Sequence, residues 1–268
     1  MRLVNTFFDQ DAVSLAKSLI GKVICRQYHG VLLKAQIIET EAYGVNDKAS
    51  HASLGYTEKR KALFMPPGTI YMYYSRGADS MNISAKGEGA AVLIKSAIIP
   101  ESQLNSNALD VMLNLNRLPK ERKRNPKKLL SGQTLLCKSL AIKVKDWDQN
   151  QFNDHLYISD NGYQPKRLIL APRLGIPEDR DSEFMYRFID YAYPERSTKN
   201  PLTTRKSNCY SQYLRHYEAI FRSWIRPRVE ILSQKVELLI AWTFFGSNLN
   251  TSRAYFMPCL LAFRSRIL

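Results

Sequence analysis

A long apolar segment, Val31 to Tyr43, most constrains what this chain can fold into. It is rich in Val, Ile and Leu, and a second segment of the same kind, Lys22 to Arg26, precedes it across a turn at His29-Gly30. Two paired strands are therefore expected. Because side chains alternate along a strand, one face of the longer strand should carry Ile37, Glu39, Glu41 and Tyr43. Two carboxylates and a tyrosine then project together from this strand.

The remaining pattern predicts short strands and short helices, which is typical of an α+β fold. Asp9 and Asp11 are candidate caps of a short helix that ends at Gly21. A hairpin with arms 70–74 and 81–84 is expected around a loop at 75–79. Further strands are expected at 90–98, 156–158, 167–170 and 184–189, and helices at 101–116 and, with Ser131 as its cap, 133–140.

The length and the distribution of residue types indicate one main domain with an extension. The chain has 268 residues, of which 45% are hydrophobic and 11% aromatic, so disorder throughout is excluded. From about Asn200 the character changes to a basic segment with aromatic residues at roughly helical spacing. We therefore expect a main domain at 1–199 and an extension at 200–268, which is either a separate helical appendage or a surface layer on the main domain.

The charge favours a polyanionic partner, either nucleic acid or an anionic membrane surface. Lys and Arg number 39 against 24 Asp and Glu, a formal net charge of +15. Much of the excess lies in residues 117–128, a segment interrupted by Pro119 and Pro126 and therefore expected to be a loop. Its basic residues are Arg117, Lys120, Arg122, Lys123, Arg124, Lys127 and Lys128. They are candidate phosphate contacts, although a solvated loop of any function has a similar composition.

Several classes of protein are excluded by missing signatures. The four cysteines form no CxxC pair, so a zinc site is not expected. The longest dense apolar stretch, 236–245, is far shorter than the roughly twenty residues that span a bilayer. The first residues lack a signal-peptide core, so export is not expected. No P-loop, GxGxxG, HExxH or GxSxG motif is present, which excludes the common ATP-driven and metalloprotease chemistries.

Seven segments occur in an order typical of one family. They are Glu39-Thr40-Glu41-Ala42-Tyr43, Ala49-Ser50-His51, Phe64-Met65-Pro66-Pro67-Gly68-Thr69-Ile70-Tyr71-Met72-Tyr73, Met81-Asn82-Ile83-Ser84, Gly89-Ala90-Ala91-Val92-Leu93-Ile94-Lys95, Leu130-Ser131-Gly132-Gln133 and Ala171-Pro172-Arg173-Leu174-Gly175-Ile176. In this order the chain resembles the alkyladenine (3-methyladenine) DNA glycosylase family over roughly residues 3–195.

The resemblance implies a single mixed domain with a curved antiparallel β-sheet, from which a β-hairpin enters the DNA minor groove. It also implies removal of alkylated or deaminated purines, of the 3-methyladenine, 7-methylguanine, hypoxanthine and ethenoadenine class, from duplex DNA. Such an enzyme flips the damaged base out of the stack and leaves an abasic site. No metal, other cofactor or lyase activity is implied. The expected partner is damaged duplex DNA rather than a membrane, and the expected form is a monomer inside the cell, in the cytoplasm or nucleoid of a bacterium or the nucleus of a eukaryote.

By motif position, the resemblance implies a role for each candidate site residue. Glu41 matches the general base that activates the attacking water, and Lys95 stands where the family has an arginine that helps to hold the water and the target phosphate. The residues that match the base pocket are Tyr43, His51, Tyr73 and Asn82. The first three sandwich the flipped base, and Asn82 screens purines at the pocket floor.

The hairpin departs from the family pattern. Arg76 precedes Gly77 at the tip, where the family has a bulky tyrosine or another large apolar residue, and the hairpin is one residue short. Either Arg76 or Tyr74 is therefore the wedge that fills the vacated stack. The competing reading of the whole chain is a non-catalytic nucleic-acid-binding protein on the same fold, which would bind without cleavage.

Overall fold

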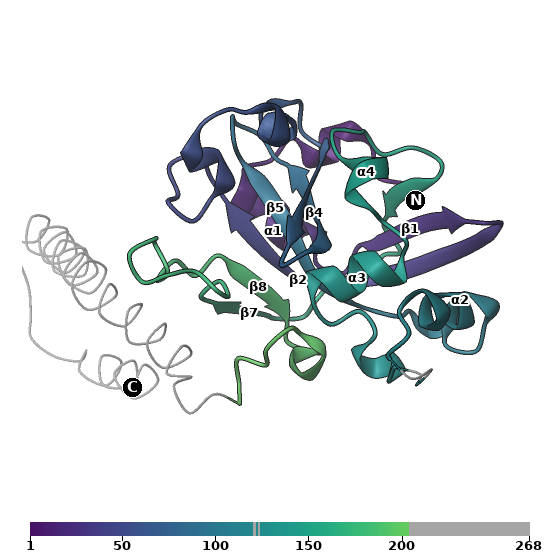
Figure 1. The fold of residues 1–268 in the computed structure, drawn as a ribbon. Helices are drawn as coiled ribbons and strands as arrows, with labels where there is room; N and C mark the ends of the chain where they lie inside the picture. Colours follow the sequence, from purple (N-terminus) through teal and green to yellow (C-terminus); the bar gives the residue numbers. More distant parts are fainter. Residues whose placement is uncertain (120–121, 123, 204–268) are drawn as a thin grey trace, which may run out of the picture. The chain divides into compact units, whose positions relative to one another are not determined.

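An antiparallel sheet forms the centre of the computed structural model, which describes residues 1–119, 122 and 124–203 (Figure 1). Its eight strands are β1 Val23–Tyr28, β2 Val31–Tyr43, β3 Ile70–Ser75, β4 Ala78–Ser84, β5 Ala91–Ile98, β6 Leu156–Ser159, β7 Leu168–Ala171 and β8 Arg187–Asp190. The order is β3-β4-β5-β2-β1-β6, and β8 pairs with both β2 and β7. The predicted mixed fold on an antiparallel sheet is confirmed. Lys120 and Lys123, which were predicted to contact phosphate, lie outside the described residues. The part of the predicted extension from residue 204 onward also lies outside them.

The helices are short and pack around this sheet. They are α1 Ala12–Leu19, α2 Asn107–Leu115, α3 Gln133–Ser139 and α4 Val144–Trp147, with 3-10 helices at Asn5–Phe8, His51–Leu54, Glu58–Phe64, Glu101–Gln103, Pro126–Lys128 and Pro194–Arg196. α1 packs on β2 and β5, whereas α3 lies against β4 and β5 (Figure 1). Among the described residues, no helix has the length and apolar character needed to cross a membrane.

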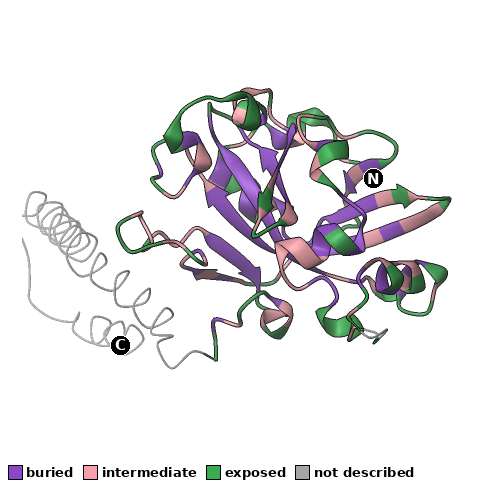
Figure 2. Cartoon of the chain, viewed as in Figure 1, coloured by how far each residue is buried: buried purple, intermediate pink, exposed green. Residues whose placement is uncertain are grey.

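Strand β2 is the central strand of the sheet, and it pairs with different strands along its length. Its first half pairs with β1, up to Val23 opposite Gln36, and its second half pairs with β5 on one edge and β8 on the other. Figure 2 shows the result: the central strands are buried, while the outer end of the β1–β2 pair is partly exposed. Both edges of residues 39–41 are therefore paired, which fixes the backbone that carries the two predicted carboxylates.

A β-bulge in β5 aims two successive side chains to one side. The β2–β5 register passes from Glu39 opposite Ser96 to Thr40 opposite Ile94, so Lys95 is an extra residue in the ladder. An extra residue breaks the strict alternation of a strand, and bulges commonly re-aim side chains next to active sites. Lys95 approaches Glu41 while Ser96 donates to Glu39, and both acids lie on one face of β2.

Helix α1 shows why the N-terminal segment folds locally. The Asp11 carboxylate accepts from the backbone N–H groups of Val13 and Ser14, both at 3.0 Å, and so caps the helix as predicted. Asp9 does not cap α1; its carboxylate lies 3.6 Å from the Lys86 ammonium. The helix is followed by Gly21, whose φ is +88° and where a Cβ would lie 2.7 Å from the Tyr163 ring. Only glycine fits there.

The hairpin is tighter than predicted. Ser75 pairs with Ala78, so the connection is the two residues Arg76 and Gly77 rather than a loop at 75–79. Both have positive φ, +51° and +80°, which matches the type I′ turn that suits the right-handed twist of paired strands. Asp79, expected in the loop, instead lies in β4, where its carboxylate accepts from the Val144 N–H at the start of α4.

Two helix predictions also change. The helix expected at 101–116 is a 3-10 turn at Glu101–Gln103 followed by α2, because a turn after Gln103 interrupts it. Ser131 does not cap α3: the N-cap is Gly132, and the Ser131 hydroxyl donates to the Arg196 carbonyl at 2.5 Å. Ser131 therefore joins the start of α3 to a segment far along the chain.

Candidate active site

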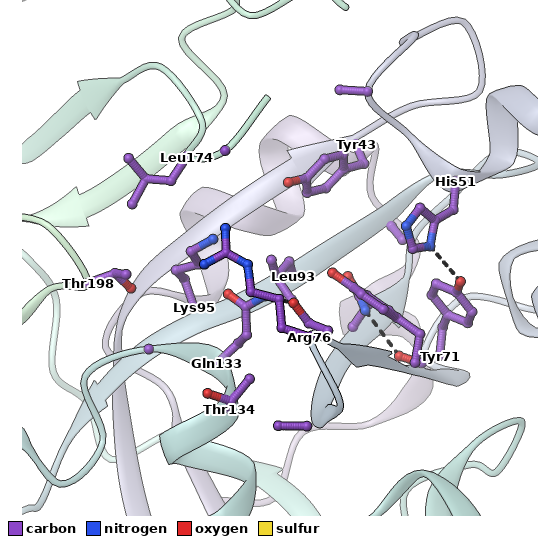
Figure 3. A pocket seen from close by; sticks show the side chains of 18 of the residues that line it. Tyr43, His51, Tyr71, Arg76, Leu93, Lys95, Gln133, Thr134, Leu174 and Thr198 are labelled. Carbon is purple, nitrogen blue, oxygen red and sulfur yellow. Dashed lines mark hydrogen bonds between the residues drawn. The ribbon is translucent and has the colours of Figure 1, made fainter. Parts of the chain in front are cut away.

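A cavity of about 650 Å³ opens between the hairpin, the end of β2 and the start of α3. Six residues predicted for the site line it: Tyr43, His51, Tyr73, Arg76, Asn82 and Lys95. Figure 3 shows Tyr43, His51 and Tyr71 on one side, with Gln133, Thr134 and Thr198 on the other. The structure thus brings the four residues predicted for the base pocket together with Lys95 and Arg76.

Glu41 lies immediately beneath this cavity. Its side chain is fully buried, and it is not among the lining residues. The Tyr43 hydroxyl donates to Oε2 at 2.8 Å and the Lys95 ammonium approaches the same oxygen at 3.2 Å, while the backbone N–H of Leu174 donates to Oε1 at 3.1 Å. The two side chains that touch Oε2 both line the cavity, so Glu41 is separated from it by one layer.

The aromatic wall is a set of rings held by hydrogen bonds. His51 Nδ1 and the Tyr71 hydroxyl are 2.8 Å apart, and the Asn82 amide donates to the Tyr71 carbonyl at 3.2 Å (Figure 3). The Tyr71 and Tyr73 rings are stacked with centroids 5.8 Å apart, and His51 meets the Tyr73 ring edge-on at 4.6 Å. Sequence reasoning assigned no role to Tyr71, although its position two residues before Tyr73 places both on one strand face.

The wall is electrically neutral near physiological pH. Burial raises the pKa of Tyr73 to about 12, and burial together with the Glu41 charge raises the pKa of Tyr43 well above 10. Burial also lowers the pKa of His51 below its ordinary 6.5, and the charges of Arg60 and Arg180 lower it further. Protonated tyrosines and a neutral imidazole offer uncharged ring faces to whatever occupies the cavity.

A buried arginine, missed in the sequence, supports this wall. Arg173 makes a two-armed contact with the Asp47 carboxylate, NH2 to Oδ1 at 2.9 Å and NH1 to Oδ2, and NH1 also donates to the Ala42 carbonyl at 3.0 Å. Burial acts to lower the pKa of Arg173, but the hydrogen bonds and charge of Asp47, together with interactions with Tyr43 and Glu41, outweigh it and raise the pKa. Arg173 precedes Leu174, so one short segment holds both the end of β2 and the Glu41 carboxylate.

The second predicted carboxylate, Glu39, lies in a separate buried network. Arg187 Nε donates to Oε1 at 2.6 Å, and Oε2 accepts from the Ser96 hydroxyl at 2.5 Å and from the Thr198 N–H at 2.8 Å. The Ser96 hydroxyl in turn accepts from the Gly132 N–H at 3.0 Å. Glu39 thereby holds the wall of the cavity that faces the tyrosines.

The two wedge candidates at the hairpin differ in whether they line the cavity. Arg76 is exposed at the turn and lines the cavity, whereas Tyr74 is 61% exposed and is not among the lining residues. The Gln133 amide lies 3.5 Å from the Ser75 hydroxyl, so the tip is next to the start of α3. Gly77 completes the turn.

The predicted basic loop leads directly into the cavity wall. The Lys128 ammonium donates to the Glu195 carbonyl and Arg196 NH1 donates to the Lys127 carbonyl, shortly before the lining segment that starts at Ser131. Arg122, Lys127 and Lys128 are exposed. Arg124 is half-buried, and Arg117 is held by the Asn114 side chain. Within residues 1–119, 122 and 124–203, no group of His, Cys, Asp or Glu side chains is arranged to hold a metal ion.

Comparisons with known proteins agree with this picture. A family model described as methylpurine-DNA glycosylase matches residues 6–194. A protein of Pseudomonas fluorescens strain Pf0-1 named "Putative 3-methyladenine DNA glycosylase" is 53% identical over 203 residues, 75% of this chain and 87% of that protein. Proteins of the same name from Pseudomonas aeruginosa strain UCBPP-PA14 and Clostridium botulinum strain Langeland are 50% and 37% identical over 202 and 203 residues. These matches cover 75% and 72% of this chain and 84% and 98% of the two proteins.

Proposed function

This chain belongs to the methylpurine-DNA glycosylase family, and we propose that it hydrolyses the N-glycosidic bond of alkylated or deaminated purines in duplex DNA, leaving an abasic site. The observation that carries the proposal is the position of Glu41, a buried carboxylate directly beneath an aromatic cavity. Such an enzyme acts on the DNA of its cell. The substrates in view are 3-methyladenine, 7-methylguanine, hypoxanthine and ethenoadenine.

The cavity would receive a flipped base. The glycosidic bond is inaccessible within an intact duplex, and flipping costs a few kcal/mol. Stacking on aromatic rings is worth about 1–3 kcal/mol per base, so Tyr43, His51 and Tyr73 would offset much of this cost. Neutral rings attract a positively charged alkylated purine through the cation–π interaction. Asn82, whose amide donates to the Tyr71 carbonyl, would reject normal guanine, because its exocyclic amino group would clash at the pocket floor.

Glu41 would act as the general base. Its Oε2 would accept a proton from the water that attacks C1′ as the damaged base leaves. Lys95 shares that oxygen and lines the cavity, so it would hold the water and the target phosphate. Lysine supplies the charge without the two-armed geometry of arginine. A purine alkylated at N3 or N7 is already cationic and leaves readily, whereas a neutral lesion such as hypoxanthine or ethenoadenine must gain a proton as it leaves. Neither case needs a Schiff base, so lyase activity should be absent.

The rest of the DNA would lie along the hairpin and the basic loop. Arg76 lines the cavity from the turn, so we assign it the wedge position, with Tyr74 as a second contact on the duplex. The exposed cations of the basic loop, Arg122, Lys127 and Lys128, would bind phosphates. We place Lys120, Lys123 and Arg124 in the same role by their sequence positions. Residues 1–199 would form the catalytic unit, working as a monomer, with 200–268 as an accessory extension.

The direct experiment measures excision from a duplex oligonucleotide that contains a single ethenoadenine or hypoxanthine. The wild-type chain should release the base and leave an alkali-labile abasic site without cutting the strand. The Glu41→Gln variant keeps the shape of the side chain but loses the proton-accepting carboxylate, so it should release little of the damaged base. Equal activity in both proteins would remove Glu41 from the role. Binding without release in either protein would identify a non-catalytic nucleic-acid-binding protein.

A further inference from the structure

Arg187 is a buried cation that the proposed chemistry does not use. In the β2–β8 pair it stands directly opposite Glu41. Directly opposed residues of an antiparallel pair project from the same face with Cβ atoms about 4.5–5.5 Å apart. The Arg187 side chain is only 2% exposed, so water does not screen its charge. An arginine in this position would be expected to bind Glu41.

Its guanidinium binds Glu39 instead. Nε donates to Glu39 Oε1 at 2.6 Å, and NH2 donates to the Lys199 carbonyl at 2.6 Å. Glu41 is left with Lys95 as its contacting cation, alongside the Tyr43 hydroxyl and the Leu174 N–H. Two buried ion pairs therefore lie on this face of β2, Glu39 with Arg187 and Glu41 with Lys95.

The pairing of Arg187 with Glu39 rather than with Glu41 has a chemical consequence for glycosidic-bond hydrolysis. As the base leaves, positive charge develops on the sugar, and the carboxylate must keep an electron pair for the attacking water. A second buried cation on Glu41 would oppose both changes. A buried charge also requires a partner, so an arginine that lost Glu39 would turn to the carboxylate opposite it.

We propose that Glu39 is a positioning residue that neutralises Arg187 and so leaves Glu41 free to act on the water. This inference rests on the function proposed above and adds a role for the second carboxylate of the Glu39-Thr40-Glu41 segment. Glu39 also holds Thr198 and, through Ser96, the start of α3. A purely structural role in that wall makes a different prediction, because each further deletion in the network should then make the enzyme worse.

The experiment compares Glu39→Gln with the double variant Glu39→Gln/Arg187→Met in the full chain. The readouts are the single-turnover rate of ethenoadenine release and the affinity for the same duplex. Glu39→Gln should slow release by about tenfold or more and change affinity by less than about threefold, since the loss lies in the chemical step. The double variant should recover most of the rate, because it removes the unpaired cation.

A matched control separates charge balance from general damage. Asp160→Asn breaks the ion pair of the buried Lys22, whose partner lies outside the cavity lining, so it should lower the melting temperature without slowing release. Melting curves show that each variant is folded at the assay temperature. If Glu39→Gln does not fold, the double variant decides by itself: release within about threefold of wild type supports the proposal, and a larger loss overturns it.

The outcomes distinguish this inference from the function on which it rests. Release by the wild type, loss in Glu41→Gln and no recovery in the folded double variant would overturn the role of Glu39 and leave the glycosylase proposal standing. No release by the wild type would overturn both. Recovery of the rate by deleting a second buried side chain is a result that a structural role does not produce.

Discussion

The Arg173 guanidinium lies over the Tyr43 ring, its central carbon 4.7 Å from the ring centroid. The same guanidinium grips Asp47, so the loop after β2 and the first ring of the aromatic wall depend on one buried cation. Tyr43 in turn donates to Glu41. A residue outside the cavity lining therefore fixes the orientation of two residues that we assign to the reaction.

Arg173→Met should destabilise the protein strongly. It leaves the Asp47 carboxylate buried without its partner, and breaking a buried pair in this way costs about 3–5 kcal/mol. Arg173→Lys keeps the charge but loses the two-armed contact of the guanidinium with Asp47, so it should lower the free energy of unfolding by less. Urea unfolding of the two variants measures the loss. Arg2→Met, which breaks an exposed pair with Asp154, is the matched control and should cost at most about 1 kcal/mol. Equal losses in Arg173→Met and Arg2→Met would show that Asp47 does not depend on Arg173.

The stability of the folded chain should fall in acid partly through His51. Its pKa is lowered by burial and by Arg60 and Arg180, so below about pH 6.5 the unfolded chain takes up a proton that the folded chain resists. The free energy of unfolding contributed by this group is complete above pH 6.5 and is lost as the pH falls through that value to the folded pKa.

Unfolding measured at pH 7.5 and 5.5 checks this assignment. The difference between the two pH values should be smaller in His51→Gln than in the wild type, since glutamine does not titrate. His155→Gln, at an exposed site, is the comparison and should leave the difference nearly unchanged. An unchanged difference in His51→Gln would place the acid sensitivity elsewhere.

Much of the proposed site follows from local sequence pattern. Alternation along β2 places Glu39, Glu41 and Tyr43 on one face, and the motif order adds His51 and Tyr73, which the fold brings to the same cavity. The alternation fails for Ile37, which packs in the same apolar cluster as Ala42, because a register shift follows it. Bulges are set by the pairing of two strands and leave no clear period in either one.

The long-range ion pairs that hold the site residues could not be predicted from local sequence pattern. Arg173 meets Asp47 across 126 residues of sequence, and Arg187 meets Glu39 across 148. Such contacts depend on how β8 and the segment before it return to β2, which no local period encodes. An arginine in a short strand gives no sign of which acid it will pair with when two lie on the same face.

The hairpin makes a prediction about which side chain enters the duplex. Because Arg76 lines the cavity from a two-residue turn, Arg76→Ala should slow excision of ethenoadenine from duplex DNA more than Tyr74→Ala does. The defect should be smaller on a single-stranded substrate, because there the flipped base leaves no gap in a stacked duplex for the wedge to fill. Parallel excision assays on the two substrates measure this. A larger duplex-specific defect in Tyr74→Ala would reverse the assignment of the wedge.

The basic loop should contribute affinity without specificity. Lys127 is exposed four residues before the cavity lining begins at Ser131, so Lys127→Ala should weaken binding to damaged and undamaged duplexes alike. The slope of log affinity against log salt should fall in magnitude by about 1, as expected for one lost phosphate contact. Fluorescence anisotropy at several salt concentrations gives the slope. Lys34→Ala, in the part of β2 that pairs with β1, is the control, and an equal change there would point to general charge rather than a contact.

Removal of the residues after Thr203 should separate catalysis from nonspecific affinity. Among the described residues, the last one that lines the cavity is Thr198, and the Arg187 guanidinium donates to the Lys199 carbonyl just beyond it. The truncated chain should therefore still release ethenoadenine at nearly the full single-turnover rate. Its affinity for undamaged duplex and its salt slope should both fall, because the removed segment is strongly basic. A folded truncated chain that binds damaged duplex but releases no base would instead make the extension part of the catalytic unit.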